Sequence, residues 1–149
     1  MEEITLNEYL SLYLDKLNHD LSNLANFAAI VYEMIPSLNW VGFYLFNGNS
    51  LYLGPFQGKA ARSIINLGEG VCGKAAQQKT MIVVDDVHKF EGHIACDDAS
   101  NSEIVIPIEM NGKLYGVLDI DSPLEKRFDE KTISLLQEAT QLLVKHLIK

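Results

Sequence analysis

The chain has 149 residues, of which 48% are hydrophobic and 21% are charged, and its formal net charge is −8. A chain of this length is expected to form a single domain over residues 1–149, with a core that needs neither disulfides nor a structural metal. The acidic balance argues against a nucleic-acid partner, because phosphate binding requires a basic face. The apolar stretches are only as long as strands or amphipathic helices, so we expect no signal peptide, no membrane contact and a cytoplasmic location.

The N-terminal part of the sequence predicts two helices. Residues 7–16 carry leucines at helical spacing, and a second apolar set with the same spacing runs from Asp20 to Ile35. Asp20 is the expected N-cap of the second helix, and Pro36 ends it.

The middle of the sequence predicts short strands. Residues 40–46 are rich in aromatic and β-branched side chains, and Asn47-Gly48 joins them to a second strand at residues 51–53. Gly54-Pro55 is expected to close this hairpin. Three further elements are expected before the next loop: strands at 64–65 and 81–84, and a short helix at 71–78.

The second half of the sequence holds the clearest hairpin, with strands at residues 103–110 and 113–121 joined by Asn111-Gly112. Phe128 and Ile133 then resemble a hydrophobic staple that opens a last helix reaching about residue 148. Helices at both ends of a mostly antiparallel sheet predict an α+β domain with the terminal helices packed on one face. The apolar seam of the last helix can pack on the sheet or on a second copy, and we expect a homodimer.

Two aspartates near the end of this hairpin are candidate site residues. Asp119 and Asp121 lie two residues apart in a strand, so their side chains share a face, roughly 7 Å apart. A carboxylate pair is costly to bury unless it is paired, hydrated or protonated. The pair can bind an ammonium group or share a proton, and the alternative is that both are ordinary residues of a turn.

Glu103 is a third acid, and the hairpin register decides which way it points. With a regular two-residue turn, Glu103 lies opposite Ile120 and faces away from the two aspartates. It can join them only if the strand is bulged or if Glu103 lies beyond the last paired residue. Pro107 is the candidate for such an irregularity.

Residues 85–102 fit no period and predict a loop of about eighteen residues, a length that is usually functional or disordered. Cys96 lies in this loop, followed by two aspartates, in polar surroundings that are typical of reactive cysteines. An inert surface thiol is the alternative. His93 is expected to order the loop or to tune Cys96. The set His88, His93, Cys96 and Asp97 matches no zinc pattern, so we expect no metal.

Six blocks of the sequence, taken in order, resemble the free methionine-(R)-sulfoxide reductases, which are stand-alone GAF domains. The blocks are residues 40–44 (WVGFY), 54–58 (GPFQG), 70–73 (GVCG), 92–97 (GHIACD), 102–105 (SEIV) and 118–121 (LDID). The resemblance covers nearly the whole chain from about Asp20 onward. It implies a GAF-like fold and reduction of free L-methionine-(R)-sulfoxide to L-methionine.

The resemblance also implies the site. Cys96 matches the catalytic cysteine, which attacks the sulfoxide sulfur, releases methionine and becomes a sulfenic acid. Glu103, Asp119 and Asp121 match the acidic pocket, and an acid is needed there to protonate the departing oxygen. The other expected substrate-binding residues are Trp40, Tyr44, Ile94 and Ala95, with the two aromatic rings beside the methyl end of the substrate.

The same resemblance implies a second thiol that resolves the sulfenic acid, with thioredoxin or another dithiol as the reductant and no bound cofactor. Cys72 matches one family cysteine, whereas the position of a third is Arg62 in this chain. Either Cys72 reaches Cys96 or an external thiol completes the cycle. At a helix start, Cys72 is expected to have its thiolate stabilised by the helix dipole, unless it is only a small buried residue.

Two classes of function therefore stay open. One is an oxidoreductase acting on a small zwitterion. The other is a non-catalytic GAF module that binds a small ligand or senses redox state through Cys72 and Cys96, because a fold does not determine a function.

Overall fold

The computed structural model describes residues 3–93 and 98–147. Within these residues, six strands form one sheet in the order β3-β2-β1-β6-β5-β4, and every neighbouring pair is antiparallel. The strands are β1 (Trp40–Phe46), β2 (Ser50–Gly58), β3 (Ile64–Asn66), β4 (Ile82–Val84), β5 (Ser102–Met110) and β6 (Lys113–Ser122). The helices are α1 (Leu6–Tyr13), α2 (Asp20–Met34), α3 (Gly70–Gln78), α4 (Glu130–Val144) and the short 3-10 helix η1 (Val87–Lys89). The expected α+β class is confirmed, and none of the described helices combines the length and apolar character needed to cross a membrane.

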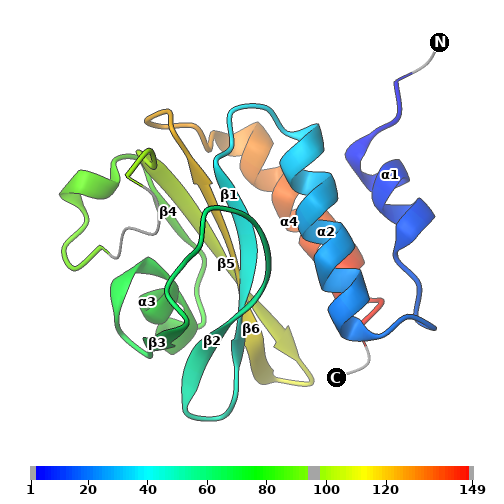
Figure 1. Cartoon of the computed structure of the whole chain (residues 1–149), viewed down its shortest axis with the longest axis horizontal. Coiled ribbons are helices and arrows are strands. Elements are labelled where there is room, and N and C mark those ends of the chain that lie inside the picture. The colour runs from blue at the N-terminus through cyan, green and yellow to red at the C-terminus, as the bar shows by residue number, and fades with distance from the viewer. Residues whose placement is uncertain (1–2, 94–97, 148–149) are drawn as a thin grey trace.

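The two faces of the sheet carry different layers. Helices α2 and α4 cover one face, with α1 packed on their outer side, as expected for the terminal helices, and α3 lies on the other face (Figure 1). Along β1, Val41 and Phe43 face the terminal helices, whereas Trp40 and Tyr44 face α3. The Phe43 ring packs on Phe27 of α2 with centroids 5.7 Å apart. Strand alternation thus separates a helix-covered core from a second apolar layer under α3.

The apolar seam of α4 packs inside the chain. Leu136 and Leu143 are fully buried, and Leu147 is 7% exposed. All three belong to the core shared by the terminal helices and the sheet. Of the two packing partners considered for this seam, the chain's own core is the one observed, so the seam gives no support to a homodimer.

Two local expectations were wrong. Gly54-Pro55 does not close the first hairpin, because β2 continues through both residues to Gly58. Its partner β3 pairs only with residues 50–52, so Pro55 lies where no neighbouring strand needs its missing N–H on that side. Asp20 is the first residue of α2 rather than its N-cap, which is His19.

A bulge in the hairpin of β5 and β6 sets the direction of Glu103. Ile108 pairs with Gly116 while Glu109 pairs with Leu114, so Tyr115 is an extra residue on β6. Beyond the bulge the register moves by one residue, and Glu103 lies opposite Asp121 instead of Ile120. The expectation that a regular hairpin turns Glu103 away is therefore wrong, and the irregularity lies at Tyr115 rather than Pro107.

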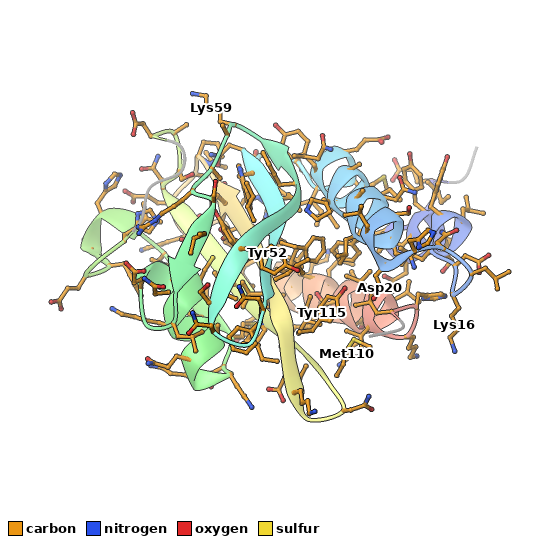
Figure 2. The ribbon with its side chains drawn as sticks, turned by 60° about the horizontal axis from the view of Figure 1, so that its bottom comes forward. Lys16, Asp20, Tyr52, Lys59, Met110 and Tyr115 are labelled. Carbon is orange, nitrogen blue, oxygen red and sulfur yellow. The ribbon has the colours of Figure 1, made fainter. Side chains whose placement is uncertain are left out.

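Contacts on both sides hold this bulge. The Tyr115 hydroxyl donates to Oδ2 of Asp20 at the start of α2, 3.2 Å away (Figure 2). Burial, followed by the Asp20 charge, raises the pKa of Tyr115 well above its usual value. The next residue has to be small, because a Cβ on Gly116 would lie 2.4 Å from the carbonyl oxygen of Tyr44. The register of the hairpin is thus anchored to α2 and to β1.

Candidate active site

Three acidic side chains, Glu103, Asp119 and Asp121, lie together on the α3 side of the sheet, and we call them the acid cluster. Asp121 lies between Glu103 of β5 and Trp40 of β1 as a direct cross-strand neighbour of both, and residues opposite each other share a face. The three acids are only 3–5% exposed. Asp119 and Asp121 share a face as expected, and both lie within β6 rather than in a turn.

Burial controls the protonation of the acid cluster. It raises the pKa of Glu103 well above its usual value, with the Asp121 charge as the next cause. It likewise raises the pKa of Asp119, followed by the charge of Glu103. Oδ1 of Asp119 is buried and has no hydrogen-bond partner among the described residues. Close buried carboxyls cannot all be ionised, so the cluster retains protons around neutral pH.

Cys72, in the first turn of α3, faces the acid cluster. It is buried, and together with Tyr44, Glu103 and Asp119 it lines a cavity of about 10 Å³, which is room for one water molecule. Burial raises the pKa of the Cys72 thiol well above its usual value, and the charges of the three acids raise it further. The expected stabilisation of its thiolate by the helix dipole is therefore outweighed, because burial and three nearby acids act against it.

An aromatic wall stands beside the acids. The Trp40 ring stacks between Tyr44 and Phe56, with centroid distances of 6.1 Å and 5.2 Å. The polar ends of the two expected substrate-binding rings are tied to the backbone, since Trp40 Nε1 donates to the Lys59 carbonyl at 3.0 Å and the Tyr44 hydroxyl donates to the Arg62 carbonyl at 2.8 Å. The wall is thus rigid before any ligand binds.

His93 contacts the acid cluster directly. Its Nε2 lies 3.1 Å from Oε1 of Glu103, and the two side chains are 14% and 6% exposed. Burial lowers the pKa of His93 below its usual value. The sequence indicated a role for this histidine in its own loop but no contact with Glu103. Such a contact depends on the strand register, which periodicity does not reveal.

Cys96, Ile94 and Ala95 lie outside the described residues, so their expected roles stay predictions. The described ends of their loop are fixed by contacts with other elements. On one side, Lys74 of α3 donates to the carbonyl of Glu91 at 3.1 Å and lies 4.8 Å from the Phe90 ring centroid. On the other, the Asn101 N–H donates to the Ser122 carbonyl at 2.7 Å. The described residues on either side of this segment include His93, which contacts Glu103, and Asn101, which contacts Ser122 next to Asp121.

Two further residues from the sequence analysis have different surroundings. Arg62, at the position of the third family cysteine, forms an ion pair with Glu69 at 3.5 Å on the surface. His88 lies within hydrogen-bond distance of Asn101, 2.9 Å away, and no group of possible metal ligands among the described residues contains His88 and His93 together.

One group among the described residues has ligand atoms close enough to hold a metal. Its members are Cys72, Glu103 and Asp119, whose ligand atoms lie within 4.8 Å of one another. These are the thiol and two of the acids already described. The arrangement is suited to proton transfer and thiol chemistry on a small bound molecule.

Comparison with known proteins gives a consistent family. The GAF domain model matches residues 11–147. The free methionine-R-sulfoxide reductase of Escherichia coli is 50% identical over 123 residues, which covers 82% of this chain and 74% of that protein. The protein of the same name from Saccharomyces cerevisiae is 44% identical over 131 residues, covering 83% of this chain and 73% of that protein.

Solved structures agree with these relatives. The fRMsr of Staphylococcus aureus, in complex with its substrate, is 44% identical and superposes with a TM-score of 0.88 over 95% of this chain and 92% of that chain. The free methionine-R-sulfoxide reductase of Neisseria meningitidis, also in complex with its substrate, is 39% identical with a TM-score of 0.85, covering 95% and 84% of the two chains.

Proposed function

The chain belongs to the GAF domain family and, within it, to the free methionine-R-sulfoxide reductases, which are oxidoreductases, and we propose that it reduces free L-methionine-(R)-sulfoxide to L-methionine. The observation that carries this proposal is the acid cluster. The bulge at Tyr115 brings Glu103 onto the face of Asp119 and Asp121, where all three are buried beside a thiol and an aromatic wall.

The proposed reaction transfers oxygen from the substrate to a cysteine. The Cys96 sulfur attacks the sulfoxide sulfur, the S–O bond breaks, and methionine leaves while Cys96 becomes a sulfenic acid. Thiol plus sulfoxide thus gives sulfenic acid plus thioether, so Cys96 is oxidised by two electrons and the substrate is reduced by two. A second thiol then displaces water from the sulfenic acid to form a disulfide.

The acid cluster supplies the proton that the departing oxygen needs. A carboxyl held neutral by burial can donate a proton at neutral pH, which an ordinary surface carboxylate cannot do. A second carboxyl of the cluster, left ionised, pairs with the ammonium group of the substrate. The raised pKa values of Glu103 and Asp119 support the neutral proton donor.

The described cavity beside Cys72 has about 10 Å³, which is room for one water molecule and not for an amino acid. The fixed rings of Trp40 and Tyr44 then provide an apolar surface for the thioether end. In this proposal the substrate carboxylate binds to backbone N–H groups of the loop that carries Ile94 and Ala95.

Resolution of the sulfenic acid is proposed to use Cys72, with thioredoxin or another dithiol reducing the disulfide. Cys72 is neutral at rest because its pKa is raised, mainly by burial, and Asp119 is close enough to hydrogen bond with its thiol. Asp119 in its ionised form can accept the thiol proton as the new S–S bond forms. Arg62 leaves no third cysteine to share this role.

Turnover of separate epimers tests the proposal. Reduced protein is incubated with the R or the S epimer of free L-methionine sulfoxide, and methionine is measured with either dithiothreitol or thioredoxin as reductant. We expect turnover of the R epimer only, and none in Cys96→Ser. Cys72→Ser is expected to keep turnover with dithiothreitol and to lose turnover with thioredoxin.

The contrary result is equally clear. No turnover of either epimer by folded, reduced protein would favour the ligand-binding GAF module instead. Turnover that survives in Cys96→Ser would remove Cys96 as the nucleophile.

The pH dependence of kcat tests the role of the acid cluster. A proton donor whose pKa is raised in the folded protein stays protonated to higher pH, so kcat is expected to be high at low pH and to fall as pH rises through the pKa of the cluster. Glu103→Gln should lower kcat at every pH. A wild-type rate that instead climbs steadily into alkaline solution would indicate simple thiolate attack without an acid.

A further inference from the structure

The acid cluster has a described contact that leads toward solvent. Its three carboxyls are 3–5% exposed and lie beside Cys72, Trp40 and Tyr44, which are also 5% exposed or less. Glu103 touches a partly exposed titratable group, which is His93 at 3.1 Å. The His93 side chain is 14% exposed, so one edge of its ring reaches water.

The full catalytic cycle requires an entry for protons. Cys96 and Cys72 each give up a thiol proton, and both protons leave with the sulfoxide oxygen as water when the disulfide forms. Reduction of the disulfide then regenerates two thiols, so two protons have to enter the site in each turnover. A carboxyl that is almost completely buried exchanges protons slowly unless a neighbouring group carries them.

We propose, on the basis of the function proposed above, that His93 is the proton relay that recharges Glu103 from solvent. A neutral imidazole has one N–H and one free ring nitrogen, so it can take a proton at Nδ1 and release one from Nε2. The Nε2 atom is the one that faces Glu103. The relay returns the proton to Glu103, and the contacts inside the acid cluster distribute it to Asp119 and Asp121.

The surroundings of His93 fit a relay better than a fixed ion pair. Burial lowers the pKa of the imidazole, and burial raises the pKa of Glu103, so both shifts favour the neutral forms between which a proton moves. Among the described residues, Glu103 on β5 is the titratable group in contact with the ring. Lys74 of α3 binds the Glu91 carbonyl and the Phe90 ring, two and three residues before His93. The His93 N–H donates to the Phe90 carbonyl at 3.2 Å, which holds the backbone in place.

Two variants separate proton relay from positioning. His93→Gln keeps a side-chain donor that can reach Glu103 but cannot pass a proton on, whereas His93→Ala leaves space for an added imidazole. With the R epimer and saturating dithiothreitol, we expect kcat to fall by roughly tenfold to hundredfold in both variants. Added imidazole should restore kcat in His93→Ala in a saturable way, and substituted imidazoles should follow their basicity.

His88→Gln is the matched control. This histidine is in the same loop and contacts Asn101 rather than the acid cluster, so its variant is expected to keep the wild-type kcat without any response to imidazole. Full activity in His93→Gln would overturn the relay, because a hydrogen bond to Glu103 would then be sufficient. Loss in both His93 variants with no rescue, in proteins with wild-type circular dichroism and thermal stability, would also overturn it and leave a positioning role.

The activity of the wild type and of His88→Gln keeps the two proposals apart. If neither protein reduces the R epimer, the proposed function itself has failed. If both reduce it and only the relay predictions fail, the function stands and His93 has no part in proton transfer.

Discussion

At the scale of single residues, the site depends on titratable groups whose pKa values are shifted so that their neutral forms are favoured. Glu103 and Asp119 are carboxyls whose pKa is raised, first by burial, and His93 is an imidazole whose pKa is lowered by burial. Neutral forms of these groups can both donate and accept protons, which ionised surface groups do poorly. Cys72 belongs to the same set, because its thiol is kept protonated by burial and by the neighbouring acids.

Cys72 is therefore expected to be a slow nucleophile toward added reagents. In a Cys96→Ser background, alkylation of Cys72 by iodoacetamide at pH 7.5 should be at least about tenfold slower than that of a small free thiol, because only the thiolate reacts. Asp119→Asn should speed the reaction, because Asp119 is the acid that raises the pKa of the Cys72 thiol most after burial. Alkylation as fast as that of a free thiol would show that Cys72 is exposed or ionised.

At the scale of elements, close approach of β1 and β2 sets the position of the aromatic wall. Gly42 lies opposite Asp119 on one side and Phe56 on the other. The Trp40 ring lies over it, and a Cβ at this position would be 2.3 Å from the Phe56 Cβ and 2.6 Å from Cη2 of Trp40. The absence of a side chain at Gly42 is thus what allows the indole to lie flat beside the acid cluster.

Gly42→Ala should accordingly disturb both stability and substrate binding. Overpacking of this kind typically costs about 1–3 kcal/mol of unfolding free energy, and displacement of the indole should raise KM for the R epimer. Gly54→Ala, where a Cβ would meet its nearest neighbours at 3.3 Å, is the matched control with a smaller expected effect. Urea unfolding and steady-state kinetics measure both. Equal effects of the two substitutions would contradict this account of Gly42.

At the scale of the whole molecule, the two faces of the sheet have different roles: one contributes most of the stability and the other holds the candidate site. One face packs on the terminal helices and forms the larger apolar core, and the other face holds buried carboxyls that oppose folding when ionised. The protein tolerates these carboxyls because the helix-covered core is separate from them. Active sites commonly contain such locally unfavourable groups, which lower stability in exchange for activity.

Asp119→Asn should stabilise the fold while lowering activity, and the gain should depend on pH. The pKa of Asp119 is raised on folding, so the wild type is most stable below the unfolded-state pKa of about 3.9 and loses stability as pH rises through the folded-state pKa. The variant does not titrate at this position, so its advantage should be near zero at pH 3.5 and reach about 1–3 kcal/mol at pH 8.

Denaturant unfolding at several pH values measures this difference. Asp129→Asn is the control, because the pKa of that exposed N-cap is lowered by hydrogen bonds from Thr132 and removing its charge gives no gain in alkaline solution. A stabilisation by Asp119→Asn that does not change with pH would show that Asp119 is not neutralised by burial.

Local patterns in the sequence were sufficient for much of the fold. Helical spacing and β-branched runs placed β1, α3 and the strands of the last hairpin to within a residue or two, because these signals depend on neighbours along the chain. The two-residue spacing of Asp119 and Asp121 likewise placed them on one face. The family resemblance added the expected roles of Cys96 and the acids, which periodicity alone cannot suggest.

The sequence by itself determined which residues alternate, where the elements lie and which side chains could carry chemistry. Only the tertiary structure decided that Glu103 joins the two aspartates, because one extra residue at Tyr115 reverses the faces of a strand and is held by Asp20, far away in the chain. It also decided that His93 touches Glu103 and that Cys72 is buried among acids. Charge and burial at a site are sums over residues brought together by folding, so no local window of sequence contains them.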